Sequence, residues 1–178
     1  MTKFFLATVA VVLGFAVWSA EAPAADPSVH FALGYGTGDS VTYDLYLKHT
    51  FMPLVSNANF ELKPITNLGV TLWEDTNSHD TAHGIYGAFG LQLNLRPWTE
   101  FQPYLAISGG PSYFSEEHFV GRDLGGYFLF NTHALLGVEF GKSLRHNLNV
   151  NLTHYSNGHT YDDNDGLNSV GLAYGYSF

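Results

Sequence analysis

A histidine and a serine stand two positions apart near the carboxyl end of the chain, in the segment His154-Tyr155-Ser156-Asn157. Serine becomes a nucleophile when a neighbouring base can take its proton, and histidine is a common base. Residues i and i+2 of a β-strand project from the same face, so a strand here would make the imidazole and the hydroxyl neighbours. The spacing therefore indicates nucleophilic catalysis by Ser156, provided that the segment is a strand.

The residues before His154 show the alternation of a strand. Apolar Leu148, Val150 and Leu152 alternate with three asparagines and a threonine, and His154 and Ser156 share the parity of the apolar side. If that side faces lipid, an imidazole and a hydroxyl on it are costly where hydrocarbon is expected. This cost favours a functional reason, and the alternative is a polar pair that lies beside the lipid headgroups.

Eight segments of the chain show this period of two, at 29–35, 41–47, 68–72, 85–95, 101–107, 128–140, 148–152 and 170–178. A membrane barrel needs apolar residues at every second position, with small or polar residues pointing inward. The predicted fold class is therefore all-β, an eight-stranded antiparallel transmembrane β-barrel. A soluble β-sandwich is the alternative, although sandwich strands rarely keep one face so free of charge.

The amino terminus predicts export. Lys3 is followed by an apolar run over 4–18 and then by Ala22-Pro23-Ala24, a pattern of small residues that is typical of signal cleavage. The run is shorter than the ~20 residues that a membrane helix needs. We therefore expect a signal peptide at 1–24 and one outer-membrane β-barrel domain at 25–178. The chain has no cysteine, so neither a disulfide framework nor thiol chemistry is expected.

Composition agrees with a surface that meets lipid. Aromatic residues make up 16% of the chain and charged residues only 13%. The formal net charge is −9, which makes nucleic acid an unexpected partner.

The direction of the strands follows if both ends of the barrel domain lie in the periplasm. The connections at 74–83, 115–123 and 158–166 would then be extracellular, and the turns at 96–100 and 141–145 periplasmic. The stretch 48–59 is longer than a periplasmic turn should be, and the pattern does not explain it.

The segment 154–157, with sequence HYSN, and the segment 164–169, with sequence NDGLNS, resemble a known family, the PagL lipid A 3-O-deacylases. These are outer-membrane barrels with a serine, histidine and acid triad on the lipid-facing surface. By this resemblance His154 is the general base, Ser156 the nucleophile, and Asn164 and Asn157 the candidate oxyanion donors. The third triad position falls on Asn168, where the family has glutamate.

The resemblance implies a serine esterase that hydrolyses the ester-linked 3-hydroxyacyl chain at position 3 of lipid A without a cofactor. Its place would be the outer membrane of a Gram-negative bacterium, with the active site facing the outer leaflet. The implied partners are lipopolysaccharide as substrate, membrane lipid and, through the terminal Phe178, the barrel-assembly machinery; a homodimer is left open. The alternative is a non-catalytic small barrel that anchors, adheres or binds.

Two polar clusters carry no metal prediction. His79 and His83 lie near acidic residues, but in a loop such a group is more often a solvated cluster than a metal site. Asp162, Asp163 and Asp165 precede a glycine, yet the spacing fails the EF-hand pattern, and only loose cation binding is left open there.

Overall fold

The computed structural model describes residues 26–96 and 99–178, and the predicted signal peptide lies outside this part. Eight long strands form the barrel: β1 (Asp26–Gly36), β2 (Ser40–Thr50), β4 (Phe60–Asp75), β5 (Thr81–Leu95), β6 (Phe101–Phe114), β9 (Phe128–Phe140), β10 (His146–Ser156) and β11 (Leu167–Ser177). The connections hold three two-residue strands and a short 3₁₀ helix, namely β3 (Val55–Ser56), β7 (His118–Phe119), β8 (Arg122–Asp123) and η1 (Lys142–Leu144).

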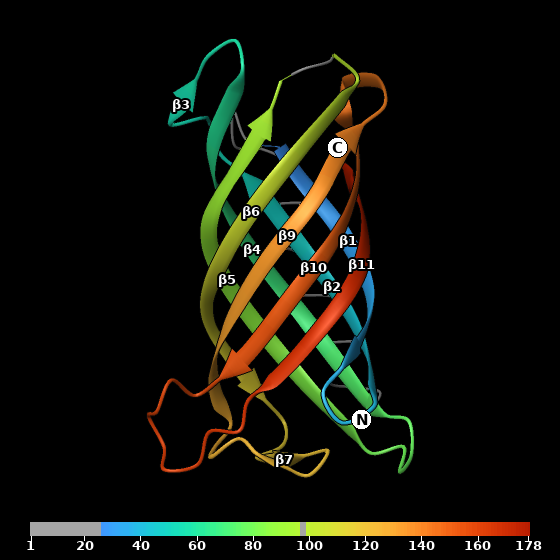
Figure 1. Ribbon diagram of the computed structural model, residues 1–178, viewed down its shortest axis with the longest axis vertical. Coiled ribbons are helices and arrows are strands. Elements are labelled where there is room, and N and C mark those ends of the chain that lie inside the picture. Colours follow the sequence, from blue (N-terminus) through green and yellow to red (C-terminus); the bar gives the residue numbers. More distant parts are fainter. Residues whose placement is uncertain (1–25, 97–98) are drawn as a thin grey trace.

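The barrel is closed by antiparallel pairing of each long strand with the next, and of β1 with β11 (Figure 1). Each of the eight segments with a period of two falls on its own strand, with only Phe178 beyond the end of β11, so the predicted eight-stranded antiparallel barrel is confirmed. Closure leaves no long edge strand, which is what a sheet in lipid requires. Between residues 26 and 96 and between 99 and 178, no helix is long and apolar enough to cross a membrane.

The outer surface is apolar and the lumen is largely polar. Phe89, Leu105 and Leu136 project outward and are each more than half exposed. Their neighbours in the strands are turned inward and buried, as the alternating burial along β9 shows. This is the pattern expected where lipid surrounds the barrel and side chains fill its interior.

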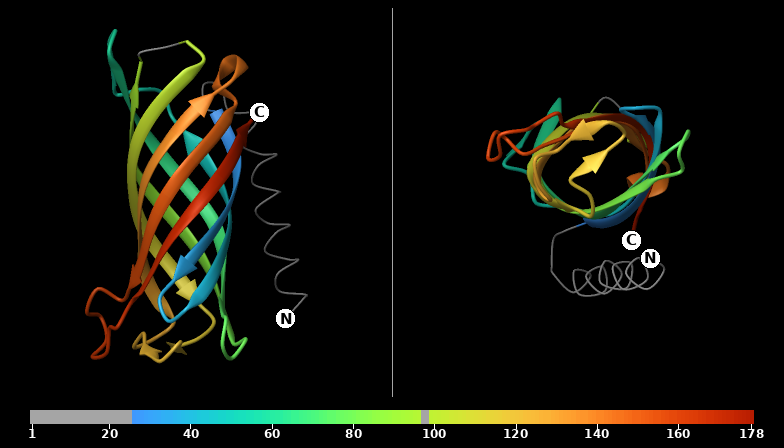
Figure 2. Two further views of the ribbon diagram at one scale, coloured as in Figure 1. Left: turned by 45° about the vertical axis from the view of Figure 1, so that its right-hand side comes forward. Right: turned by 90° about the horizontal axis from the view of Figure 1, so that it is seen from below.

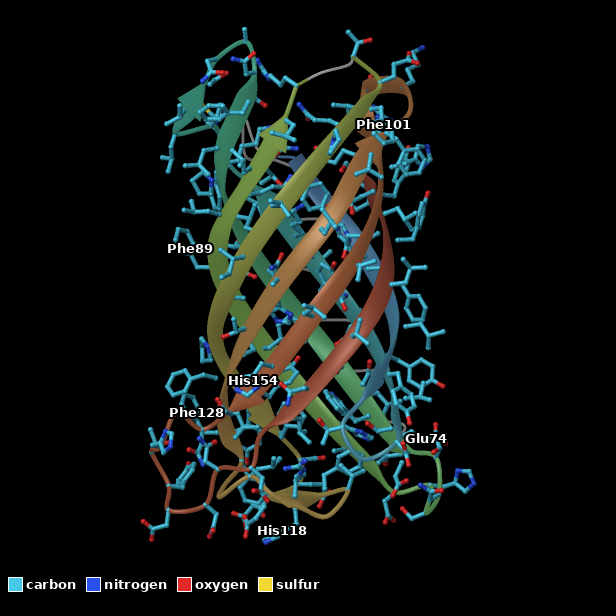
Figure 3. The ribbon with its side chains drawn as sticks, viewed as in Figure 1. Glu74, Phe89, Phe101, His118, Phe128 and His154 are labelled. Atoms are coloured by element: carbon cyan, nitrogen blue, oxygen red, sulfur yellow. The ribbon has the colours of Figure 1, made fainter. Side chains whose placement is uncertain are left out.

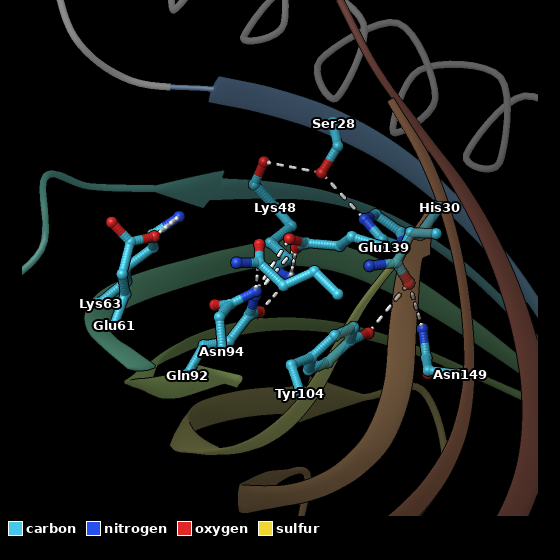
Figure 4. A network of polar contacts seen from close by, with 12 residues as sticks. Ser28, His30, Lys48, Glu61, Lys63, Gln92, Asn94, Tyr104, Glu139 and Asn149 are labelled. Atoms are coloured by element: carbon cyan, nitrogen blue, oxygen red, sulfur yellow. Dashed lines mark hydrogen bonds and ion pairs between the residues drawn. The ribbon is translucent and has the colours of Figure 1, made fainter. Parts of the chain in front are cut away.

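Glu139 is the centre of a polar network in the lumen, near the end of the barrel that holds the carboxyl terminus. Glu139 accepts hydrogen bonds from Gln92 and Asn94, each at 2.9 Å, and lies 4.0 Å from the Lys48 ammonium (Figure 4). Lys48 is 4% exposed, donates to Gln92 and lies 4.9 Å from the centre of the Tyr104 ring. A buried lysine needs such partners, so this network offsets the cost of its charge in the lumen.

An apolar plug fills the opposite mouth of the barrel. The hairpin of β7 and β8 lies across this opening (Figure 2), and Phe119 and Leu124 from the same connection are buried there. The plug consists of eight buried residues: Trp73, Ala82, Phe114, Phe119, Leu124, Leu129, Tyr155 and Leu167. Two of them, Tyr155 and Leu167, belong to the strands that carry the candidate site.

The stretch 48–59 extends the barrel wall as a short hairpin. β2 continues to Thr50, and β4 begins at Phe60, well before the segment at 68–72 that the alternation marked. Between them, Leu54 donates to the carbonyl of Leu62 at 2.8 Å, and β3 pairs with β4. The sequence did not show this part of β4 because Pro64 and Thr66 interrupt the apolar positions between Leu62 and Leu68.

Candidate active site

His154 and Ser156 lie at the end of β10 nearest the plug. The His154 side chain is exposed on the outer surface (Figure 3), Tyr155 between them is fully buried, and Ser156 is half-buried. In the register of the sheet, His154 stands opposite Asn168 on β11 and Thr132 on β9. The strand thus presents the imidazole and the hydroxyl on its outer side, as the spacing predicted.

Asn168 lies directly beside His154. The Nδ1 atom of His154 and the Oδ1 atom of Asn168 are 2.8 Å apart, which is a normal hydrogen-bond length. An amide oxygen can only accept a hydrogen bond, so Nδ1 carries the proton in this pair and Nε2 keeps its lone pair. The structure thus places the residue at the third triad position next to the imidazole, in a pair that leaves the Nε2 lone pair as the ring's proton acceptor.

Gly166 borders both candidate residues. Its φ is +66°, and a Cβ at this position would lie 3.2 Å from Cε1 of His154 and 3.7 Å from Cβ of Ser156. The same Cβ would lie 3.0 Å from the carbonyl oxygen of Tyr155. Glycine fits this left-handed conformation and close approach best. We did not single out Gly166 from the sequence, although a glycine directly before a strand is a recognisable signal.

The two asparagines considered for the oxyanion have different surroundings. Asn157 is fully buried, and its amide donates to the carbonyls of Leu124 and Asp163 and accepts from the backbone of His159. Its side chain therefore holds the loop together. Asn164 is half-buried, and its Oδ1 accepts from the backbone N–H of Asn157 at 2.8 Å. This bond leaves the NH₂ group of Asn164 as the end that can donate to a substrate.

A second connection supports the loop that carries Asn164. The backbone N–H of Asp123 donates to the carboxylate of Asp165 at 2.9 Å, and the N–H of Asp165 donates to the carbonyl of Asp123 at 3.0 Å. The loop at 157–166 is thus tied to the connection at 115–127. In the part of the chain that the structure describes, no group of three His, Asp or Glu side chains is placed to hold a metal ion.

The family model described as Lipid A 3-O-deacylase (PagL) matches residues 37–177. The chain belongs to this family. A PagL relative from Bordetella bronchiseptica (strain ATCC BAA-588 / NCTC 13252 / RB50), described as a lipid A deacylase, is 29% identical over 172 residues, which cover 94% of this chain and 93% of the relative. The residues matched by the family model include both segments on which the resemblance to PagL rested.

Solved structures agree on the fold. The crystal structure of the outer membrane enzyme PagL has a TM-score of 0.77 and 22% identity, and the match covers 85% of this chain and 99% of that one. The crystal structure of Neisserial surface protein A has a TM-score of 0.50 and 12% identity, with coverage of 86% and 96%. The PagL family and the outer-membrane barrel predicted from the sequence are therefore confirmed.

Proposed function

We propose that this chain hydrolyses the ester bond of the 3-hydroxyacyl chain at position 3 of lipid A, as a serine esterase without a cofactor. The observation that carries the proposal is the hydrogen bond of 2.8 Å between His154 and Asn168, next to Ser156, on the outer face of a PagL-family barrel. A substrate held in the membrane by its acyl chains reaches such a face without leaving the lipid.

In the proposed first step, the Oγ of Ser156 attacks the ester carbonyl while Nε2 of His154 takes its proton. The new bond joins Oγ to the acyl carbon, and negative charge gathers on the carbonyl oxygen. The NH₂ group of Asn164 would stabilise that oxygen by donating a hydrogen bond. The ester bond then breaks, the proton on His154 passes to the departing sugar oxygen, and the acyl chain remains on Ser156.

In the second step, His154 takes a proton from water, and the resulting hydroxide attacks the acyl-serine. The proton returns to Ser156 as the fatty acid leaves. Asn168 keeps the ring oriented through both steps, but its neutral amide stabilises the imidazolium less than a carboxylate would.

The proposal places the site at the outer leaflet. The three connections that the sequence assigned to the exterior, at 74–83, 115–123 and 158–166, all lie at the plugged end of the barrel. The carboxyl terminus lies at the opposite end (Figure 2), where Phe178 is exposed. Recognition of Phe178 by the barrel-assembly machinery belongs to the same proposal. Lipopolysaccharide occupies the outer leaflet, so His154 and Ser156 would meet their substrate there.

The test is mass spectrometry of lipid A after expression of the parent and of Ser156→Ala and His154→Ala variants. The parent should remove one 3-hydroxyacyl group, and each variant should be at least about a thousandfold slower. Both changes are on the outer surface, so folding should be unaffected, and a heat-dependent shift on gels checks it. A folded parent that leaves lipid A intact would favour the non-catalytic barrel. An active Ser156→Ala variant would exclude the acyl-serine.

A further inference from the structure

We propose that Thr37 is a positioning residue for the reaction, acting on His154 through Asn168. Thr37 lies in the turn between β1 and β2, 131 positions before Asn168 in the sequence. The inference rests on the proposed function, because it assigns a partner to the residue that orients the general base.

Three hydrogen bonds join Thr37 to the backbone of Asn168. The backbone N–H of Thr37 donates to the carbonyl of Asn168 at 2.8 Å. The hydroxyl of Thr37 accepts from the N–H of Asn168 at 2.9 Å and donates to its carbonyl at 3.2 Å. One hydroxyl therefore bonds both polar groups of the Asn168 backbone.

The hydroxyl continues the sheet where the backbone pairing ends. The register between β1 and β11 ends with Gly36 opposite Ser169, so the next residues on the two strands are Thr37 and Asn168. Beyond that pair, the Thr37 hydroxyl takes the place of a strand carbonyl as acceptor for the Asn168 N–H. Asn168 is thus held from two sides, by Thr37 through its backbone and by His154 through its side chain.

The turn that carries Thr37 is itself well fixed. The buried Ser40 donates to the carbonyl of Thr37 at 2.9 Å, and Thr76 donates to the carbonyl of Asp39 at 2.7 Å. Gly38, with φ of +69°, lies so close to Val120 that an added Cβ would meet it at 2.5 Å. Thr37 is therefore a firm support for Asn168, with neighbours from β2 and from two other connections.

The neutral side chain of Asn168 makes this support important. Without a charge behind the imidazole, the contribution of Asn168 is to fix the ring's tautomer and direction. Catalysis is sensitive to displacements well below 1 Å in such groups. A displaced Asn168 backbone would move Oδ1 away from Nδ1 and release the ring.

The experiment compares purified Thr37→Val, Thr37→Ser and Asn168→Ala variants, and the double variant Thr37→Val with Asn168→Ala, on lipid A. Thr37→Val keeps the branched shape and loses the hydroxyl, so kcat should fall about three- to tenfold with little change in KM. Thr37→Ser keeps the hydroxyl and should restore most of kcat. In the Asn168→Ala background, Thr37→Val should cause no further loss, because the group it positions is gone.

A matched control is Thr50→Val, at the far end of β2, which should keep the parent kcat. The gel shift shows whether each variant folds, and Thr37→Ala replaces Thr37→Val if the valine prevents folding. The inference is overturned if a folded Thr37→Val or Thr37→Ala enzyme keeps the parent kcat, if its loss adds fully to that of Asn168→Ala, or if serine restores nothing.

These outcomes are distinct from failure of the proposed function. An inactive parent, or an active Ser156→Ala variant, removes the serine mechanism and the inference with it. An active parent with an inactive Ser156→Ala variant and a fully active Thr37→Val variant removes the inference alone.

Discussion

The replacement of Asn168 by glutamate tests whether Asn168 orients His154 as the proposed general base. By the resemblance to PagL, Asn168 stands at the position of the family's glutamate, and its Oδ1 lies 2.8 Å from Nδ1 of His154. A carboxylate at this position would accept the same hydrogen bond and add a negative charge beside the imidazolium that forms during the reaction. We therefore expect Asn168→Glu to raise kcat and Asn168→Ala to lower it.

The size of the gain depends on what surrounds the pair. With charges about 5 Å apart, Coulomb's law gives about 1 kcal/mol if water screens them and about 3 kcal/mol at the dielectric typical of a protein surface. These energies correspond to a rise in kcat of about fivefold to about 150-fold. The side chains of His154 and Asn168 are both exposed, so we expect a rise in kcat of about fivefold unless bound lipid A covers them. Asn168→Ala removes one hydrogen bond and should cost about three- to tenfold.

Two further variants distinguish the effect of the charge at position 168 from the effect of side-chain length. Asn168→Asp adds the charge with the length of the present side chain, and Asn168→Gln has the length of glutamate without the charge. Release of the 3-hydroxy fatty acid from lipid A in detergent gives kcat for all four variants, and the gel shift checks folding.

The outcomes discriminate clearly. If the charge matters, the glutamate and aspartate enzymes are faster than the parent and the glutamine enzyme is not. Equal rates for Asn168→Glu and Asn168→Gln would show that the charge is not the cause. If Asn168→Ala matches the parent, Asn168 does not orient His154, and Asp163 becomes the next candidate, since Asp165 is bonded to Asp123.

Two other predictions follow from the geometry. Gly166→Ala should reduce kcat at least about tenfold, because its Cβ would crowd His154 at 3.2 Å. Gly121→Ala is the control: its φ of +71° is equally left-handed but its surroundings are open, so activity should persist, and equal losses in the two would contradict the steric argument. Glu139→Ala should destabilise the barrel by about 3 kcal/mol, because it leaves the Lys48 ammonium in the lumen without its carboxylate. A denaturant midpoint equal to that of the parent would refute this, and deacylation by the folded fraction should be unchanged.

The parts of the site that depend on strand parity could be predicted from the sequence. A period of two assigns every strand residue to one face, so His154, Ser156 and Asn168 could be placed outside before the structure was known. Parity also indicates the direction of Asn157. Asn157 shares its parity with the inward Thr153 and Tyr155, and the structure buries it completely.

The loop contacts could not be predicted in this way. The bonds from Asn157 to Leu124 and between Asp123 and Asp165 join residues 33 and 42 positions apart. They depend on how two long connections pack over the mouth of the barrel, and no periodicity governs that packing. The bonds of Thr37 to Asn168 have a related cause. They lie just beyond the pairing of the first and last strands, in a turn that follows no alternation.

Plug residues that fill one mouth of the barrel also fix the direction of the candidate site residues. Tyr155 is fully buried and its ring lies 4.8 Å from that of Phe114 and 6.2 Å from that of Trp73, centre to centre. Because neighbours on a strand face opposite ways, anchoring Tyr155 in the plug directs the residues on either side of it outward. Leu167, also in the plug, does the same for Asn168. The proposed triad of Ser156, His154 and Asn168 has no charged third member and would depend on such orientation, so substitutions in the plug should reduce kcat even where no plug residue touches the substrate.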